Sequence, residues 1–258
     1  MNSDSTDLPP LNDPPAPSPL PVRLANVYAA PGEVFDALRG QPSSVANWLV
    51  PAILAALVGI VSVLVMFSQP AIRQQIEDLQ SKRYEQLVAD GKMTQEQVDQ
   101  LQRQMGDLQF TIGRIAGMIG ALVGVFAWLF TLAVVFFLLL RWGFRVHLPY
   151  MKTVEIVGLA QMIGVLGGLV TTLLMVIMGS MFANLGPILF ISNFDAGNKL
   201  HLLASSTNLF TLWWLAVVAL GLARVGQIPF GKMAFALFGL WVALRLTIVF
   251  SGLGASGM

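Results

Sequence analysis

Five long apolar stretches constrain the fold of this chain more than any other feature of its sequence. A helix needs about 20 apolar residues to cross a hydrocarbon layer about 30 Å thick, and each stretch is close to that length or longer. The pattern therefore predicts an all-α integral membrane bundle of five transmembrane helices. The stretches cover residues 48–68, 115–140, 156–182, 207–223 and 233–252, and only the last contains a charge, Arg245.

The composition excludes the soluble classes of protein. Hydrophobic residues make up 55% of the chain and charged residues only 11%, against roughly 25% charged residues in soluble domains. A water-soluble fold could not cover so much apolar surface. The 15 Lys and Arg residues against 14 Asp and Glu residues give a net charge of +1, so we expect the lipid bilayer, and no nucleic acid, as a partner.

The spans divide the chain into regions of different composition. No apolar run precedes residue 48, so we expect the first span to act as its own membrane signal. The expected regions are a disordered Pro-rich tail at 1–21, an amphipathic cytoplasmic or interfacial segment at 22–47, a five-span membrane domain at 48–252, and a short C-terminal tail at 253–258.

The segment before the first span has the signals of a short helix. Pro31 is suited to the first helical position, and Gly40 followed by Pro42 marks the end. Val34, Phe35 and Leu38 share one face. Two placements of this face stay open, in the headgroup layer or packed against the ends of the spans.

The long polar insertion between the first and second spans, residues 70–111, is predicted to form an antiparallel helical hairpin outside the membrane. Gly91 lies in a helix-stopping turn, and Thr94 with Gln97 has the spacing of a capping box that begins a second helix. The hairpin either packs on itself or offers a docking surface to a partner or a second copy. Its apolar seams are Ile72, Ile76, Leu79 and Leu87 on the first helix, and Val98, Leu101, Met105 and Leu108 on the second.

Positive charge predicts the orientation, because Lys and Arg accumulate in short cytoplasmic loops. The short connections 141–152 and 224–232 contain three and two such charges and lie on one side. We therefore expect a cytoplasmic N-terminus and an outer C-terminus, in a bacterial cytoplasmic membrane. Arg73 and Arg114 lie near span ends on the opposite side and argue against this orientation.

The two cytoplasmic connections resemble each other. Each has an aliphatic residue, proline, an aromatic residue, any residue and lysine, with Pro149 and Lys152 in one and Pro229 and Lys232 in the other. Each proline would begin a returning helix, and each lysine would extend to the headgroups. Two explanations of the match stay open. The span pairs are an internal repeat, or any helix that returns into the membrane independently acquires a proline and a lysine at these positions.

Small residues recur at four-residue spacing along the spans, a pattern that favours close helix packing in lipid. We expect most of these stripes to make contacts within the chain, with a homo-oligomer seam as the alternative. The stripes are Ala52 with Ala56, Ala55 with Gly59, Ala116 with Gly120 and Gly124, Ala160 with Gly164, Gly168 and Thr172, and Ala219 with Ala223.

Few residues can carry chemistry inside the spans. Arg245 is expected to extend to the outer surface, and Glu155 at the cytoplasmic mouth to pair with Lys152. His147 and His201 are placed in loops, and the chain has no HExxH pair and no phosphate-binding loop. The weak functional candidates are therefore Arg245, Glu155, Pro149, Lys152, Pro229 and Lys232, and we expect neither an enzyme nor a cofactor.

The order of these features resembles bacterial Yip-domain membrane proteins. The resemblance rests on residues 28–38, the Gln41-Pro42 pair, the run Trp48-Leu49-Val50-Pro51, and later Trp214, Gly221 and Lys232. It implies five spans and a membrane-organising role, since eukaryotic members act in vesicle traffic and bind Rab-type GTPases. The Asp-Leu-Tyr-Gly-Pro motif of those members is missing from this sequence, so the resemblance implies the fold rather than GTPase binding.

Two functions follow from the sequence. The first is a non-enzymatic membrane scaffold, with protein partners at the N-terminal region or at the 70–111 hairpin. The second is a small-solute permease or channel, suggested by the repeat and by a helix break near Asn184 and Gly186.

Overall fold

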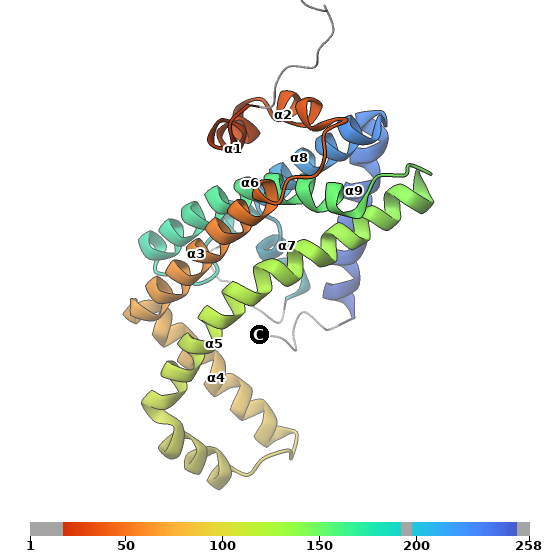
Figure 1. Cartoon of the computed structure of the whole chain (residues 1–258). Coiled ribbons are helices and arrows are strands. Elements are labelled where there is room, and N and C mark those ends of the chain that lie inside the picture. Colours follow the sequence, from red (N-terminus) through yellow and green to blue (C-terminus); the bar gives the residue numbers. More distant parts are fainter. Residues whose placement is uncertain (1–17, 192–197, 252–258) are drawn as a thin grey trace, which may run out of the picture.

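The computed structural model describes residues 18–191 and 198–251, apart from the side chains of residues 105–107. In this part of the chain every regular element is a helix and there are no strands, which confirms the all-α fold (Figure 1). The long elements are α1 (Leu20–Ala29), α2 (Pro31–Leu38), α3 (Ala46–Ser68), α4 (Pro70–Ala89), α5 (Gln95–Leu138), α6 (Tyr150–Met178), α7 (Lys199–Ser206), α8 (Leu209–Gly226) and α9 (Phe230–Phe250), joined in places by the π-helical turn η1 (Leu139–Gly143) and the 3-10 turn η2 (Pro187–Phe190).

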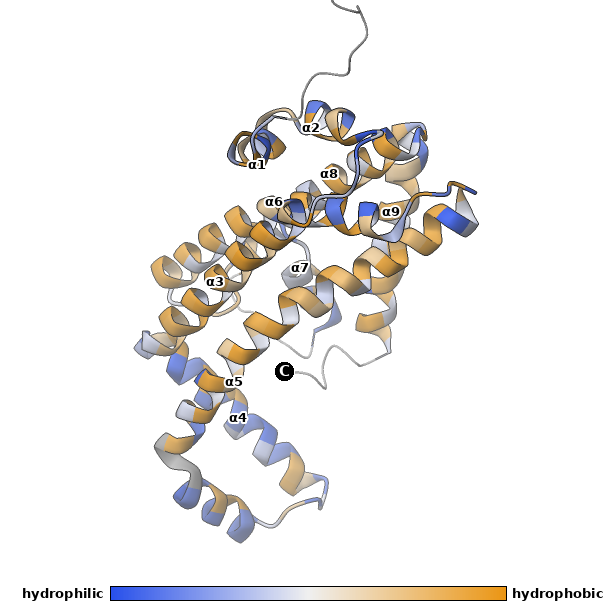
Figure 2. Cartoon of the chain, viewed as in Figure 1, coloured by the Kyte–Doolittle hydropathy of each residue, from blue (hydrophilic) through white to orange (hydrophobic). Residues whose placement is uncertain are grey.

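Five helices are long and apolar enough to cross a membrane, and each one contains most of a predicted apolar stretch. They are α3, the part of α5 and η1 from Leu108 to Gly143, α6, α8 and α9. Hydrophobic residues fill the bundle in Figure 2, while hydrophilic residues gather at its two ends. The short helix α7 was not predicted, and it places His201 in a helix rather than a loop.

The second half of the hairpin and the second span are one continuous helix. Helix α5 has 44 residues and contains no proline that could break it. It begins at the predicted capping box, where Gln97 N donates to Thr94 Oγ1 and Thr94 N donates to Gln97 Oε1. The hairpin is thus a direct extension of the bundle.

The two hairpin helices meet only in part along the predicted seam: Ile72 and Val98 are buried, and Arg73 of α4 lies over the Phe110 ring of α5. The side chain of Met105 lies outside the described residues. Among the described residues, α4 and α5 do not form one of the closely packed helix pairs, and Leu108 of the predicted seam is 54% exposed.

The start of α4 is also tied to α6, since Gln75 donates to the Gly179 carbonyl and accepts from Met181 N at 3.1 Å. The half-buried amide of Gln75 thus satisfies two backbone groups beyond the last turn of α6.

Helices α1 and α2 lie across the end of the bundle opposite to the hairpin (Figure 1). Helix α1 packs on α6 and α2 packs on α8, and the side chains of Val27 and Phe35 are fully buried. The structure therefore shows the packed placement of this segment, and α1 begins at Leu20, within the range expected for the tail. The remainder of that tail, residues 1–17, and the tail at 253–258 lie outside the described residues. We call the two ends of the bundle the clamp end and the hairpin end.

Small residues allow α3 and α6 to approach closely. A Cβ on Gly158 would overlap the backbone of Trp48, and one on Gly168 would lie 2.9 Å from Val58. Ser62 and Thr172 share a hydrogen bond across the same interface. The alanines of the α3 and α8 stripes and Ala160 of α6 are buried, and Gly59 and Gly168 contact neighbouring helices, which confirms those expectations. Gly164 faces only Gln161 of its own helix, so the expected contact is wrong there.

The stripe on α5 behaves differently. Ala116, Gly120 and Gly124 are exposed, so the expected contact within the chain is wrong. The neighbouring face packs on α3 instead, where a Cβ on Gly117 would lie 3.0 Å from Val63 and Gly59 faces Ala121 in the same way. Small residues recur at four-residue spacing on both faces of α5. The angle at which α5 crosses α3 determines which of these faces packs.

A pair of Gly→Ala substitutions tests this packing. Gly158→Ala inserts a methyl group into the Trp48 backbone and should lower the free energy of unfolding by about 1–3 kcal/mol. Gly120→Ala meets no atom and should be neutral or stabilising by up to about 1 kcal/mol, through helix propensity. Thermal unfolding in detergent measures both; equal midpoints would refute the assigned α3–α6 contact.

Candidate functional site

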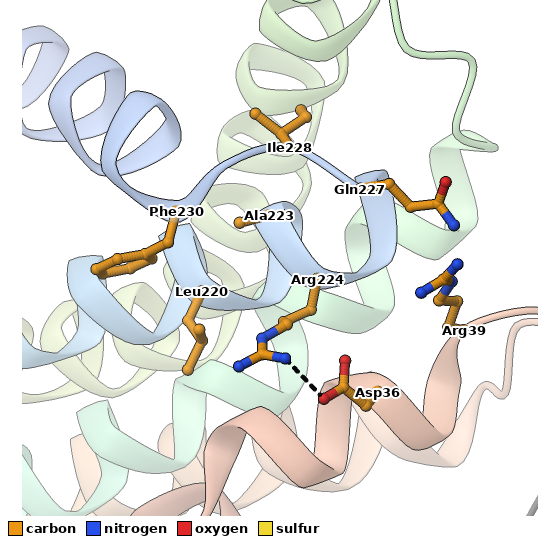
Figure 3. A pocket seen from close by; sticks show the side chains of 8 residues that line it. All are labelled: Asp36, Arg39, Leu220, Ala223, Arg224, Gln227, Ile228 and Phe230. Carbon is orange, nitrogen blue, oxygen red and sulfur yellow. Dashed lines mark hydrogen bonds and ion pairs between the residues drawn. The ribbon is translucent and has the colours of Figure 1, made fainter.

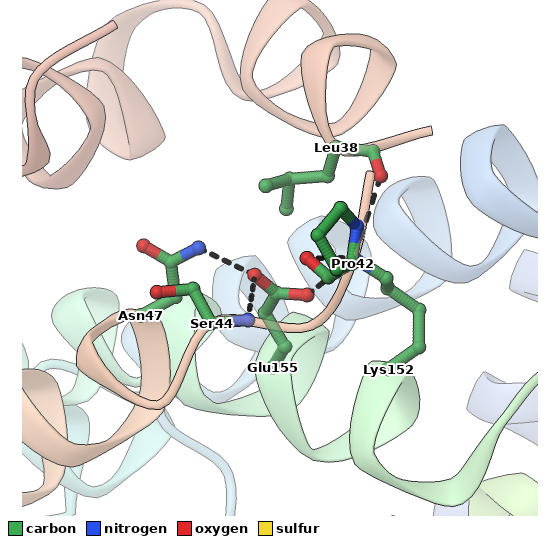
Figure 4. Close-up of polar contacts among 6 residues, drawn as sticks. All are labelled: Leu38, Pro42, Ser44, Asn47, Lys152 and Glu155. Carbon is green, nitrogen blue, oxygen red and sulfur yellow. Dashed lines mark hydrogen bonds and ion pairs between the residues drawn. The ribbon is translucent and has the colours of Figure 1, made fainter. Parts of the chain in front are cut away.

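A buried ion pair lies at the clamp end, one turn inside α6. Lys152 Nζ is 2.6 Å from Glu155 Oε2, and the two side chains are 6% and 0% exposed. Pro149 is the N-cap of α6, and its fixed backbone places Lys152 and Glu155 on one helical face (Figure 4). The pairing expected from the sequence is confirmed.

The loop between α2 and α3 closes over this pair and completes its hydrogen bonds. Glu155 Oε1 accepts from Asn47 Nδ2 and, at 3.2 Å, from the backbone N of Ser44. Lys152 Nζ is directed toward the carbonyls of Leu38 and Pro42, at 3.4 Å and 3.5 Å. We call these residues with the ion pair the clamp network, because they hold the loop 38–47 on α6. Ser44 and Asn47 carry no sequence signal that would have identified them.

The clamp network corrects the expectation that Lys152 extends to the headgroups. The loop covers Lys152, whereas Lys232 is exposed at the start of α9. Pro149 and Pro229 both precede the first residue of a helix, as predicted. Phe235 occupies the position that matches Glu155 and is 83% exposed, so the two motifs share a turn but not a chemistry.

Two further contacts attach α1 and α2 to the spans. Tyr28 donates its hydroxyl proton to the Met162 carbonyl at 2.7 Å, and burial raises the pKa of Tyr28 above its usual value of 10.0. The hydroxyl therefore stays protonated, and keeps this hydrogen bond, throughout the neutral range. Asp36 pairs with Arg224 of α8 at 3.1 Å on the surface.

A pocket of about 520 Å³ opens beside the Asp36–Arg224 pair, between α2, the end of α8 and the start of α9 (Figure 3). Gln227 faces Arg39 across the pocket and accepts a hydrogen bond from its Nε at 2.9 Å when the amide oxygen is directed toward the guanidinium. The pocket thus has a polar rim and an apolar floor. Its lining residues are Asp36, Arg39, Leu220, Ala223, Arg224, Gln227, Ile228 and Phe230.

The hairpin end holds a second pocket, of about 360 Å³, and Arg245 lines it. The Arg245 guanidinium lies over the ring of Trp241, 5.9 Å from its centroid. The structure therefore separates the two charged candidates, since Glu155 lies near the beginning of α6 and Arg245 near the end of α9. In residues 18–191 and 198–251, no three His, Asp or Glu side chains lie close enough together to hold a metal ion.

The helical bundle, its five apolar spans and its polar ends define a multi-pass membrane protein. Residues 25–253 match the family model of the Yip1 domain, which covers nearly the whole chain. The chain therefore belongs to the Yip1 family of non-enzymatic membrane proteins, as its entry motif suggested. No curated protein and no solved structure matches the chain significantly.

Substitution within the ion pair tests the clamp network. Glu155→Gln leaves the Lys152 ammonium buried without a counter-charge and should lower the free energy of unfolding by about 3–5 kcal/mol. Lys232→Gln removes an exposed charge from the matching motif and should change it by less than about 0.5 kcal/mol. Thermal unfolding in detergent compares the two variants.

The double variant Lys152→Met, Glu155→Leu provides the control for the cause. An apolar pair of similar volume removes both charges and should recover most of the lost stability. If the double variant is less stable than Glu155→Gln, the loss arises from packing and not from an unpaired charge.

Proposed function

We propose that the protein is a membrane-organising scaffold that presents a fixed docking surface to a protein partner at its clamp end. The single observation that carries this proposal is the clamp network, in which the Lys152–Glu155 pair is buried and contacted by the segment 38–47, from the end of α2 to the first turn of α3. The surface consists of α2, the end of α8 and the start of α9, around the 520 Å³ pocket.

The energetics of the network support this role. Burying two charges is expensive, and an ion pair of this kind contributes little net stability compared with an apolar pair. What it does supply is a set of specific contacts for the segment 38–47, since Ser44 and Asn47 donate to Glu155 and the carbonyls of Leu38 and Pro42 face Lys152. A rigid attachment of α2 lowers the ordering cost when a partner binds.

The composition of the surface fits a transient protein interface. Leu220, Ala223 and Phe230 form an apolar floor, while the rim holds Asp36, Arg39 and Arg224. An apolar centre with a polar, arginine-containing rim is typical of such interfaces. The basic connections 141–152 and 224–232 lie at the same end, which supports its placement on the cytoplasmic side of a bacterial membrane.

Other surfaces remain as secondary proposals for contact. The hairpin extends from the opposite end, and the exposed small residues of α5 could bring a second copy close. The clamp end is favoured over both, because the buried charges of the described residues, Lys152 and Glu155, lie beside that surface.

Site-specific photo-crosslinking in intact membranes tests the docking surface. A photoreactive residue at Arg39 or Phe230, on the pocket, should give a discrete adduct with a protein partner. The same residue at Phe235, which is 83% exposed on the apolar side of α9, should react with lipid and give none. Introducing Glu155→Gln should reduce the pocket adducts at unchanged protein level, since the loop is released.

Adducts that are equal at Phe235 and Phe230, or recovery of monomer alone from every position, would contradict the scaffold. If the adducts persist in the Glu155→Gln variant, the pocket is still a partner site, but the clamp network is not what holds it in place.

The alternative is a small-solute permease or channel, and the pocket around Arg245 together with the break between α6 and η2 is the observation that favours it. The apolar core between the two ends argues against a path. Purified protein in liposomes should therefore show no solute flux above that of empty liposomes; flux that is abolished by Arg245→Gln or Glu155→Gln would establish transport.

A further inference from the structure

The pocket at the hairpin end has the chemistry of an anion site. Among the described residues, its polar lining consists of hydroxyl and amide side chains and one guanidinium, and includes no Asp or Glu. Met175, Met181 and Phe182 supply an apolar wall. The polar residues that line it are Thr171, Asn184, Ser205, Ser206, Asn208, Thr211 and Arg245.

Arg245 carries an uncompensated charge in this pocket. The Trp241 ring stabilises one face of the guanidinium, but within the described ranges 18–191 and 198–251 no carboxylate pairs with it. An arginine within an apolar span is expensive to maintain, and its fork of donors matches the oxygens of a phosphate. An anion bound beside it would remove this cost.

Two further donors line the same space. In the described part of the chain, the Thr211 hydroxyl and the Asn208 side-chain Nδ2 have no hydrogen-bond partner. By contrast, Ser205 and Ser206 donate to the carbonyls of Leu202 and Leu203. Phe210 N is bonded to Asn208 Oδ1, so the first turn of α8 contributes its positive dipole rather than a free N–H group.

The depth of the pocket indicates where the anion would come from. Thr171 and Met175 lie in the last two turns of α6, Asn208 and Thr211 at the beginning of α8, and Arg245 in the last two turns of α9. These positions lie near the ends of three helices that are long and apolar enough to cross a membrane. The ends of such spans are expected close to the level where lipid phosphates meet hydrocarbon.

We propose that this pocket binds the phosphate group of a phospholipid from the leaflet at the hairpin end. Arg245 takes the charge, Thr211 and Asn208 donate to the phosphate oxygens, and the methionine and phenylalanine wall contacts the glycerol and the first acyl carbons. The lipid then fills the space between the end of α6 and α9.

The test uses the full-length protein in mild detergent and three probes at equal concentration: dioctanoyl phosphatidylglycerol, dioctanoylglycerol and inorganic phosphate. Native mass spectrometry measures binding, and thermal unfolding measures the stabilisation that binding produces. The phospholipid should bind and raise the unfolding midpoint, whereas dioctanoylglycerol and inorganic phosphate should do neither.

The variants separate the site from general lipid adhesion. Arg245→Gln should weaken phospholipid binding by about tenfold or more, as expected for the loss of a charge-assisted hydrogen bond. Thr211→Val, which keeps the shape of the side chain, should weaken it less. Lys232→Gln removes one charge from the opposite end of the same helix and should leave binding unchanged.

Three results would overturn the proposal. They are phospholipid binding unaffected by Arg245→Gln, equal binding of dioctanoylglycerol, and inorganic phosphate that binds as well as the phospholipid, which would assign the pocket to a soluble anion. If Arg245→Gln does not fold, phospholipid affinity is measured in Arg245→Lys and Thr211→Val instead. An affinity that is unchanged in both variants would refute the site.

Discussion

The crossing of α3 over α6 is the contact on which the rest of the structure depends. In lipid, helices gain little from burying apolar surface, so they associate where small residues let their backbones approach. The backbone of Trp48 packs against Gly158. The preceding residue, Asn47, then reaches Glu155, which lies one helical turn before Gly158. The close approach and the clamp network are therefore one arrangement, and Tyr28 extends it to α1 through Met162.

In the described part of the bundle, Lys152 and Glu155 lie at one end and Arg245 near the other, and their surroundings differ. At the clamp end Lys152 and Glu155 neutralise each other and fix a loop. At the hairpin end Arg245 has an aromatic ring beside it and a pocket in front of it. The first arrangement suits a rigid surface, and the second suits an anionic ligand, because only an unpaired charge gains by binding one.

The degree to which sequence predicted structure depended on the range of the interaction. The capping box at Thr94 and the helix starts after Pro149 and Pro229 were predictable, because each involves neighbours in the chain. The face of α5 that packs was not, since Gly113 and Gly117 alternate with Gly120 along the same helix. The helix α7 was missed because its apolar residues are too few to set a period.

The sequence by itself determined that the chain is helical with five membrane-spanning stretches, because a long continuous apolar segment can satisfy its backbone hydrogen bonds within itself in hydrocarbon only as a helix. It also identified Lys152, Glu155 and Arg245 as the charges that required an explanation. Only the tertiary structure decided that the first two are buried beneath a loop and that the third lines a pocket. The burial of the ion pair depends on residues far away in the chain, such as Asn47, which lies 108 positions from Glu155. The pocket of Arg245 depends on residues of α6 and α8, and no local rule connects them.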